Sequence, residues 1–194
     1  MKDKLISIFF NTISLVVWAA TIAIVVTSLV LLCTGMTKPP VFTLRYARVI
    51  PADAAVLAEN GKAGDDWYAV ELNVLVAASN LSPFTYTAEG FAVGAAEGIS
   101  ENAFLAVEPS SLSFSKAAPQ KVKITYYAES PAGAEALAEA ARDLAFRFTS
   151  YTGRFTFLKF PFKGDLPGFT VAQFNEPIYT GTEEITLGEA DPAA

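Results

Sequence analysis

Residues 5 to 33 form one continuous apolar stretch, "LISIFFNTISLVVWAATIAIVVTSLVLLC", that contains no charged side chain. A helix rises about 1.5 Å per residue, so about 20 residues cross a hydrocarbon core roughly 30 Å thick. A helix buried in a soluble core would not run this long without a charge. The stretch from Leu5 to Cys33 is therefore predicted to be a transmembrane helix.

A cleaved signal peptide is the main alternative for this stretch. Signal peptides have an apolar region of roughly 7–15 residues followed by a site of small residues. Here the apolar run is about twice that length, and the one passable site, Cys33-Thr34-Gly35, follows the whole run. Lipoprotein processing at Cys33 is disfavoured because bulky Leu32 precedes it. We expect an uncleaved anchor.

The orientation of this anchor depends on the charges beside it. Lys2 and Lys4 precede the apolar run, whereas Lys38, Arg45 and Arg48 follow it. Lys2 and Lys4 adjoin the run directly, while both arginines fall in a predicted strand, and long translocated domains largely escape the positive-inside rule. We expect the N-terminus in the cytoplasm and the following domain on the other side of the membrane.

Beyond Pro39-Pro40, a connector that no helix crosses, the apolar pattern changes to a period of two. In the first strand Phe42, Leu44 and Tyr46 are predicted to share one face. Residues 67–77 give the clearest alternation, and residues 84–95, 103–115 and 120–129 are short alternating runs bounded by Gly, Pro or Ser. Several short strands with turns at this spacing predict a mainly β fold, an antiparallel immunoglobulin- or fibronectin-like β-sandwich.

One segment, "SPAGAEALAEAARDLAFRF", has helical spacing instead. Ser130 is a candidate N-cap and Pro131 a candidate first helical residue. Leu137, Ala141 and Leu144 then recur at the spacing of one helix face. We expect one crossover helix of about three turns, between strands or across one end of the sandwich.

Strands return after this helix with many aromatic residues. Gly153 is predicted to sit in a hairpin turn. The alternation of Phe155 and Phe157 shifts by one residue before Phe160 and Phe162, which predicts a bulge or bend at Leu158-Lys159. These four phenylalanines are a candidate apolar surface for a ligand or partner, although fifteen phenylalanines in a chain of this kind more often indicate a well-filled core.

These patterns divide the chain into four parts. Residues 1–35 are a cytoplasmic stub and transmembrane helix, and residues 36–40 are a Pro-containing connector. Residues 41–180 are the β-sandwich domain, and residues 181–194 are an acidic flexible tail, because the chain is short of apolar residues after Leu187.

Charge and composition exclude several functions. From Met36 onward the chain carries 12 basic and 19 acidic residues, a net charge of −7, which disfavours nucleic acid and anionic lipid surfaces. The absence of histidine excludes Ser-His-Asp triads and histidine metal sites. Asp65 and Asp66 in a Gly-rich loop are weak calcium candidates, since the EF-hand spacing is missing and solvated loop charge explains them better. We expect no cofactor.

The segment "NVLVAASNLSPFTYT" ends a strand in a polar corner and begins another at Phe84. Asn80 can accept hydrogen bonds from backbone donors there, and Pro83 biases Ser82 toward extended geometry. We expect the chain to cross here from one sheet to the other, with an ordinary surface turn as the alternative. Asn80-Leu81-Ser82 is also formally a glycosylation acceptor, which Pro83 disfavours.

With its single N-terminal span, "KPP-V-F" exit and Asn80-to-Phe84 corner, the chain resembles the late embryogenesis abundant type-2 family, also called the WHy domain. That family has an Asn-Pro-x-Pro-Phe-like corner; here Leu81 replaces the first proline. Further similarities are the segment 136–146, Tyr151-Thr152-Gly153, and a late turn over residues 164–167. The resemblance covers residues 40 to 175 and implies a stress- or envelope-associated role.

The sequence predicts a single-pass, membrane-anchored, non-enzymatic β-sandwich that acts by binding, with the lipid bilayer and a protein as its partners. A tethered carrier of lipid or another hydrophobic ligand, with the Phe-rich strands as its pocket, is the alternative. An enzyme would need an unusual carboxylate site.

Overall fold

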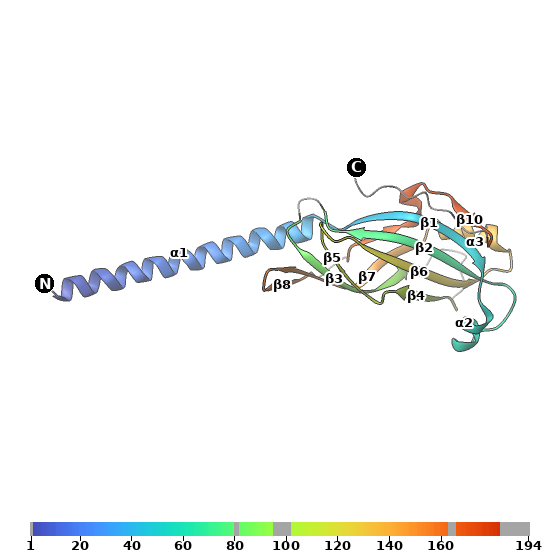
Figure 1. The fold of residues 1–194 in the computed structure, drawn as a ribbon, viewed down its shortest axis with the longest axis horizontal. Coiled ribbons are helices and arrows are strands. Elements are labelled where there is room, and N and C mark those ends of the chain that lie inside the picture. The colour runs from blue at the N-terminus through green and yellow to red at the C-terminus, as the bar shows by residue number, and fades with distance from the viewer. Residues whose placement is uncertain (1, 80–81, 95–101, 163–165, 183–194) are drawn as a thin grey trace. The chain divides into compact units, whose positions relative to one another are not determined.

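The computed structural model describes residues 2–79, 82–94, 102–162 and 166–182 (Figure 1). The chain divides into two compact units, Met1–Lys38 and Pro39–Ala194. The predicted corner residues Asn80 and Leu81, the first residues of the predicted turn at 164–167, and the acidic tail from residue 183 onward lie outside the described residues.

The first unit is the helix α1, Lys2–Thr37. Its segment Phe10–Val30 has a mean hydropathy of 2.4, and none of it is buried. The hydroxyl of Thr21 donates to the Val17 carbonyl at 2.8 Å, so this polar group is satisfied within the helix. By length and composition α1 can cross a membrane.

The second unit contains two five-stranded sheets, which confirms the predicted mainly β fold with two layers (Figure 1). The first sheet has the order β10 (Ile178–Thr180), β1 (Val41–Pro51), β2 (Trp67–Ala77), β6 (Gln120–Glu129) and β4 (Phe104–Glu108). The second sheet has the order β5 (Ser111–Phe114), β3 (Thr85–Gly94), β7 (Ala145–Phe155) and β8 (Leu158–Pro161), and β9 (Gly168–Thr170) also pairs with β7. All pairs are antiparallel except β1 with β10, which is parallel.

The core lies between the two sheets, where the period-two pattern points its apolar side chains. On β2 every second residue is completely buried, namely Val70, Leu72, Val74 and Val76. The second sheet contributes mainly aromatic side chains that are at most 1% exposed, namely Tyr86, Phe114, Phe146 and Phe148. Six phenylalanines are at most 6% exposed in this core, and the burial of each stabilises the fold by about 1.5–3 kcal/mol.

Strand β1 departs from the predicted alternation. The pairing with β2 shifts between Leu44 and Tyr46, so that Arg45 is an extra residue in the strand. Leu44 is buried before this bulge, whereas Ala47 and Val49 are buried after it. The prediction that Tyr46 shares a face with Leu44 is therefore wrong, because one inserted residue exchanges the two faces of a strand.

The corner after β2 carries the chain from the first sheet to the second, as predicted. Ser82 is buried, and its hydroxyl lies 2.5 Å from that of Tyr86 and accepts from the Phe84 backbone amide at 3.3 Å. Phe84 is 2% exposed. A polar side chain thus satisfies the backbone where the ladder ends, and the next aromatic residue returns to the core.

The crossover helix α3, Ala134–Ala141, is shorter than predicted and begins later. Gly133 occupies the N-cap with a φ of 91°, and Ser130 forms a turn in which its hydroxyl donates to the Gly133 carbonyl. Ser130 and Pro131 therefore precede the helix. Leu137, Ala138 and Ala141 are buried. A second short helix, α2 (Ala54–Glu59), follows β1, and a 3-10 helix, η1 (Val171–Phe174), follows β9.

Strands β7 and β8 form a hairpin whose turn is not at the predicted position. Gly153 lies within β7, and the turn consists of Thr156 and Phe157, with Thr156 at a φ of 53°. The shift in the Phe pattern marks this tight turn and not a bulge at Leu158-Lys159. A Cβ on Gly153 would lie 2.7 Å from the Phe162 ring, so glycine is needed for packing.

The sandwich has two ends, which we call proximal and distal. At the proximal end β1 begins, β2 passes into β3, and β7 turns into β8. Two strand pairings show that these points lie together: Val41 at the start of β1 pairs with Ala77 at the end of β2, and Thr85 at the start of β3 pairs with Arg154 near the end of β7. The distal end holds α2 and α3 (Figure 1).

Candidate interaction surfaces

An ion-pair cluster lies on the outer face of the first sheet, where neighbouring strands bring three charges together. Glu71 on β2 accepts from Arg48 on β1 at 2.6 Å and from Lys123 on β6 at 2.8 Å. The Glu71 side chain is only 8% exposed. Arg48 also lies 5.8 Å from the centre of the Tyr46 ring.

These contacts determine the ionisation of the cluster. Burial alone raises the pKa of Glu71, but the hydrogen bonds from Lys123 and Arg48 outweigh it and hold that pKa below its ordinary value. The hydrogen bond to Glu71 raises the pKa of Lys123. A carboxylate held ionised by two cations is a poor proton donor near neutral pH, so the cluster is suited to joining strands.

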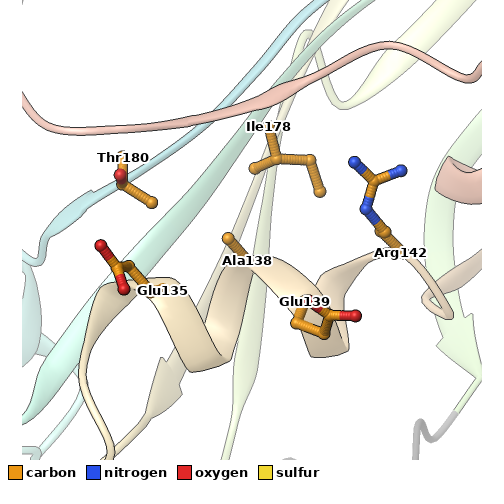
Figure 2. Close-up of a pocket in the computed structure, with 6 residues that line it drawn as sticks. All are labelled: Glu135, Ala138, Glu139, Arg142, Ile178 and Thr180. Atoms are coloured by element: carbon orange, nitrogen blue, oxygen red, sulfur yellow. The ribbon is translucent and has the colours of Figure 1, made fainter.

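A shallow hollow of about 260 Å³ lies between α3 and β10. Its lining residues are Glu135, Ala138, Glu139, Arg142, Ile178 and Thr180 (Figure 2). Figure 2 shows Glu135, Ala138, Glu139 and Arg142 along α3, with Ile178 and Thr180 of β10 across from them. A hollow with charges of both signs along its α3 side suits a polar segment of a partner better than a lipid chain.

The four predicted phenylalanines do not form one surface. The rings of Phe160 and Phe162 meet the buried Phe84 ring edge-on, with centroids 5.5 and 6.1 Å away. Phe155 is half-buried at the end of β7. Phe157 stands apart at the hairpin turn and is 79% exposed. The structure thus separates one exposed ring from three that contribute to packing.

The calcium candidates Asp65 and Asp66 lie exposed in the turn before β2. The backbone carbonyl of Asp66 accepts from the Ser130 amide at 2.8 Å, which ties this turn to the loop before α3. Within the described part of the chain no group of three metal-ligating side chains comes together. Two carboxylates alone do not supply the six to eight oxygen ligands that calcium takes.

Charge is unevenly distributed between the two ends of the sandwich, which sequence reasoning missed. The described segments 41–44, 74–79, 82–86, 112–122 and 151–162 form the proximal end, and all their charged residues are basic: Lys116, Lys121, Arg154 and Lys159. The distal segments 52–67 and 129–147 carry mostly acidic residues: Asp53, Glu59, Asp65, Asp66, Glu129, Glu135, Glu139 and Asp143, against Lys62, Arg142 and Arg147.

Fold and surfaces together define a two-sheet β-sandwich that follows an apolar helix of membrane-spanning length. A comparison with protein-family models found no match to this chain, and a comparison with curated protein sequences found none either.

Proposed function

We propose that this protein is a single-pass, membrane-anchored β-sandwich that acts by binding a protein partner and not by catalysis. The main support is helix α1, whose segment Phe10–Val30 is apolar and wholly unburied within its own unit. Apolar side chains on all sides of a helix are stable in hydrocarbon and costly in water, by about 25 cal/mol per Å².

The binding role rests on the surfaces of the sandwich. Glu71, the one buried carboxylate among the described residues, is already engaged by two cations, which leaves it little capacity for acid–base chemistry. The hollow beside α3 is open and of mixed charge, and the neighbouring edge strand β10 presents Tyr179 at 48% exposure. An edge strand with a charged hollow beside it suits an extended peptide segment.

The resemblance to the late embryogenesis abundant type-2 family supports a stress- or envelope-associated role for this binding. It rests on the corner that ends at Phe84 and on Tyr151-Thr152-Gly153. The proposed orientation places the N-terminus in the cytoplasm and the sandwich on the opposite side of the membrane.

Protease treatment of sealed vesicles tests both anchoring and orientation. In vesicles whose interior corresponds to the cytoplasm, protease should remove the sandwich and leave a membrane-embedded fragment containing α1. Release of the intact chain by alkaline carbonate would contradict anchoring. Protection of the sandwich until detergent is added would reverse the orientation.

The binding surface is tested by photo-crosslinking from a benzoylphenylalanine placed at Tyr179. We expect one discrete crosslinked partner, lost when Arg142→Glu reverses the charge beside the hollow. A matched probe at Ala63, which is exposed away from the hollow, should not form it. If the purified protein instead carries stoichiometric lipid and no crosslink forms, the tethered-carrier alternative is favoured.

A further inference from the structure

We infer that the β7–β8 hairpin at the proximal end is a second membrane contact, which places the Phe157 ring in the headgroup layer and binds anionic lipid through its flanking cations. This inference rests on the proposed anchoring by α1. It specifies the surface of the sandwich that faces the bilayer.

The tip of the hairpin has the composition of an interfacial element. Phe157 is 79% exposed at the turn, so most of this large apolar side chain faces water. Arg154 and Lys159 are directly paired across the two strands, and both are exposed. An aromatic ring flanked by cations is typical of segments that lie in the membrane interface.

The pair of cations also indicates what binds there. Like charges directly opposite each other destabilise an antiparallel pair. In the described part of the chain neither Arg154 nor Lys159 forms an ion pair with an acidic side chain. The guanidinium of Arg154 donates a hydrogen bond to the Thr156 carbonyl, 2.7 Å away. An anion outside the protein would relieve this repulsion.

The rest of the proximal end extends the same positive surface. Lys116 lies in the loop between β5 and β6, and Lys121 is exposed near the start of β6. The described part of this end is therefore positive although the whole domain is acidic, because the fold places most of the described carboxylates in the distal segments 52–67 and 129–147. A positive end is attracted to anionic lipid, and the acidic distal end is repelled from it.

Chain length brings this end within reach of the bilayer. The apolar run ends at Cys33, α1 ends at Thr37, and β1 begins at Val41. Four helical residues and four extended ones span at most roughly 20 Å. Whatever angle the connector adopts, the first residue of β1 stays close to the headgroup layer, and the hairpin turn is at the same end of the sandwich.

The test uses the full chain in lipid nanodiscs, with Cys33 replaced by Ser and one new cysteine carrying a polarity-sensitive fluorophore. Labels are placed at Thr156 beside the tip, at Ala58 on the distal end as a matched control, and at Ile22 within α1. Nanodiscs of phosphatidylcholine alone are compared with nanodiscs in which a third of the lipid is phosphatidylglycerol, and quenching is measured with headgroup spin labels and with mid-chain spin labels.

We expect headgroup quenchers to quench the label at Thr156 and not the label at Ala58, and more strongly with phosphatidylglycerol. Phe157→Ser should lower the ratio of docked to free hairpin about tenfold or more, which is the change in equilibrium expected when one large apolar side chain is no longer transferred out of water. Arg154→Gln and Lys159→Gln should each lower it about fivefold in the anionic nanodiscs only. Because both positions are exposed and removing either charge relieves their mutual repulsion, neither Gln variant should lower the thermal unfolding midpoint.

Equal, weak quenching at Thr156 and Ala58 in both nanodiscs would overturn the inference. The label at Ile22 separates this outcome from failure of the anchor. Mid-chain quenching at Ile22 without quenching at Thr156 refutes the hairpin contact alone, whereas no quenching at Ile22 refutes the membrane anchoring on which it rests. Quenching at Thr156 that Phe157→Ser leaves unaltered would also refute the role of the ring.

Discussion

Replacing Tyr151 by Phe should make this protein more stable, although Tyr151 belongs to its core. The side chain is 3% exposed, and its ring stacks on Tyr86 and Phe148 at centroid distances of 5.0 and 5.7 Å. Its hydroxyl oxygen has no hydrogen-bond partner among the described residues. Burial, with the Tyr86 phenol adding to it, raises the pKa of Tyr151 far above its ordinary value, so the hydroxyl stays neutral.

The magnitude follows from the cost of burying that hydroxyl. An unpaired buried hydroxyl costs about 1–3 kcal/mol, and phenylalanine removes it while keeping the ring and its stacking. We therefore expect the free energy of unfolding to rise by about 1–2 kcal/mol. For a domain of this size each kcal/mol raises the melting temperature by about 2–4 °C.

Tyr86→Phe is the matched control, because it makes the same chemical change on the neighbouring ring. The Tyr86 side chain is completely buried, but its hydroxyl is paired with that of Ser82 at 2.5 Å. Removing it breaks that hydrogen bond and leaves the buried Ser82 hydroxyl less well satisfied, so the free energy of unfolding should fall by about 1–2 kcal/mol.

The assay is thermal unfolding of the full chain in detergent micelles, followed by near-ultraviolet circular dichroism. The two substitutions should shift the midpoint in opposite directions. A lower midpoint for Tyr151→Phe, or equal shifts of the same sign for both variants, would refute the assignment of one unpaired and one paired hydroxyl.

The remaining predictions concern the ion-pair cluster and one glycine. Glu71→Gln should lower the free energy of unfolding by about 1–2 kcal/mol at neutral pH, a value below that of a fully buried pair because Lys123 is 44% exposed. The pKa of Glu71 in the folded protein lies below its ordinary value of 4.5. The stability that ionised Glu71 contributes is therefore fully present at pH values above 4.5 and is lost as the pH falls through the folded pKa. The melting midpoints of the Glu71→Gln variant and the parent should converge in acid. Gly153→Ala should cost about 1–3 kcal/mol by forcing the Phe162 and Phe84 rings apart, and a midpoint equal to that of the parent would contradict this packing.

The sequence alone could predict the parts of this fold that depend on local periodicity. An unbroken apolar run is sufficient to indicate the helix α1, and alternation along residues 67–77 is sufficient to indicate a strand with Val70 and Leu72 facing inward. The corner ending at Phe84 could be recognised because proline and serine act on their immediate neighbours. Such features need no knowledge of distant residues.

In two places where the sequence failed, the deciding contact was not local. Arg45 exchanges the faces of β1 only through its mismatch with β2, and Gly153 is glycine because the distant Phe84 and Phe162 rings cover it. Propensity placed a helix start at Pro131, but the turn between Ser130 and Gly133 delays it.

By itself the sequence determined the apolar helix of membrane-spanning length, the mainly β domain and the overall negative charge, because these follow from composition and from periods of a few residues. Only the tertiary structure decided where the charges lie. Strand register brings Arg48, Glu71 and Lys123 together, and strand direction separates a basic proximal end from an acidic distal one. Net charge is a sum over the chain, whereas the field at a surface depends on which residues the fold makes neighbours.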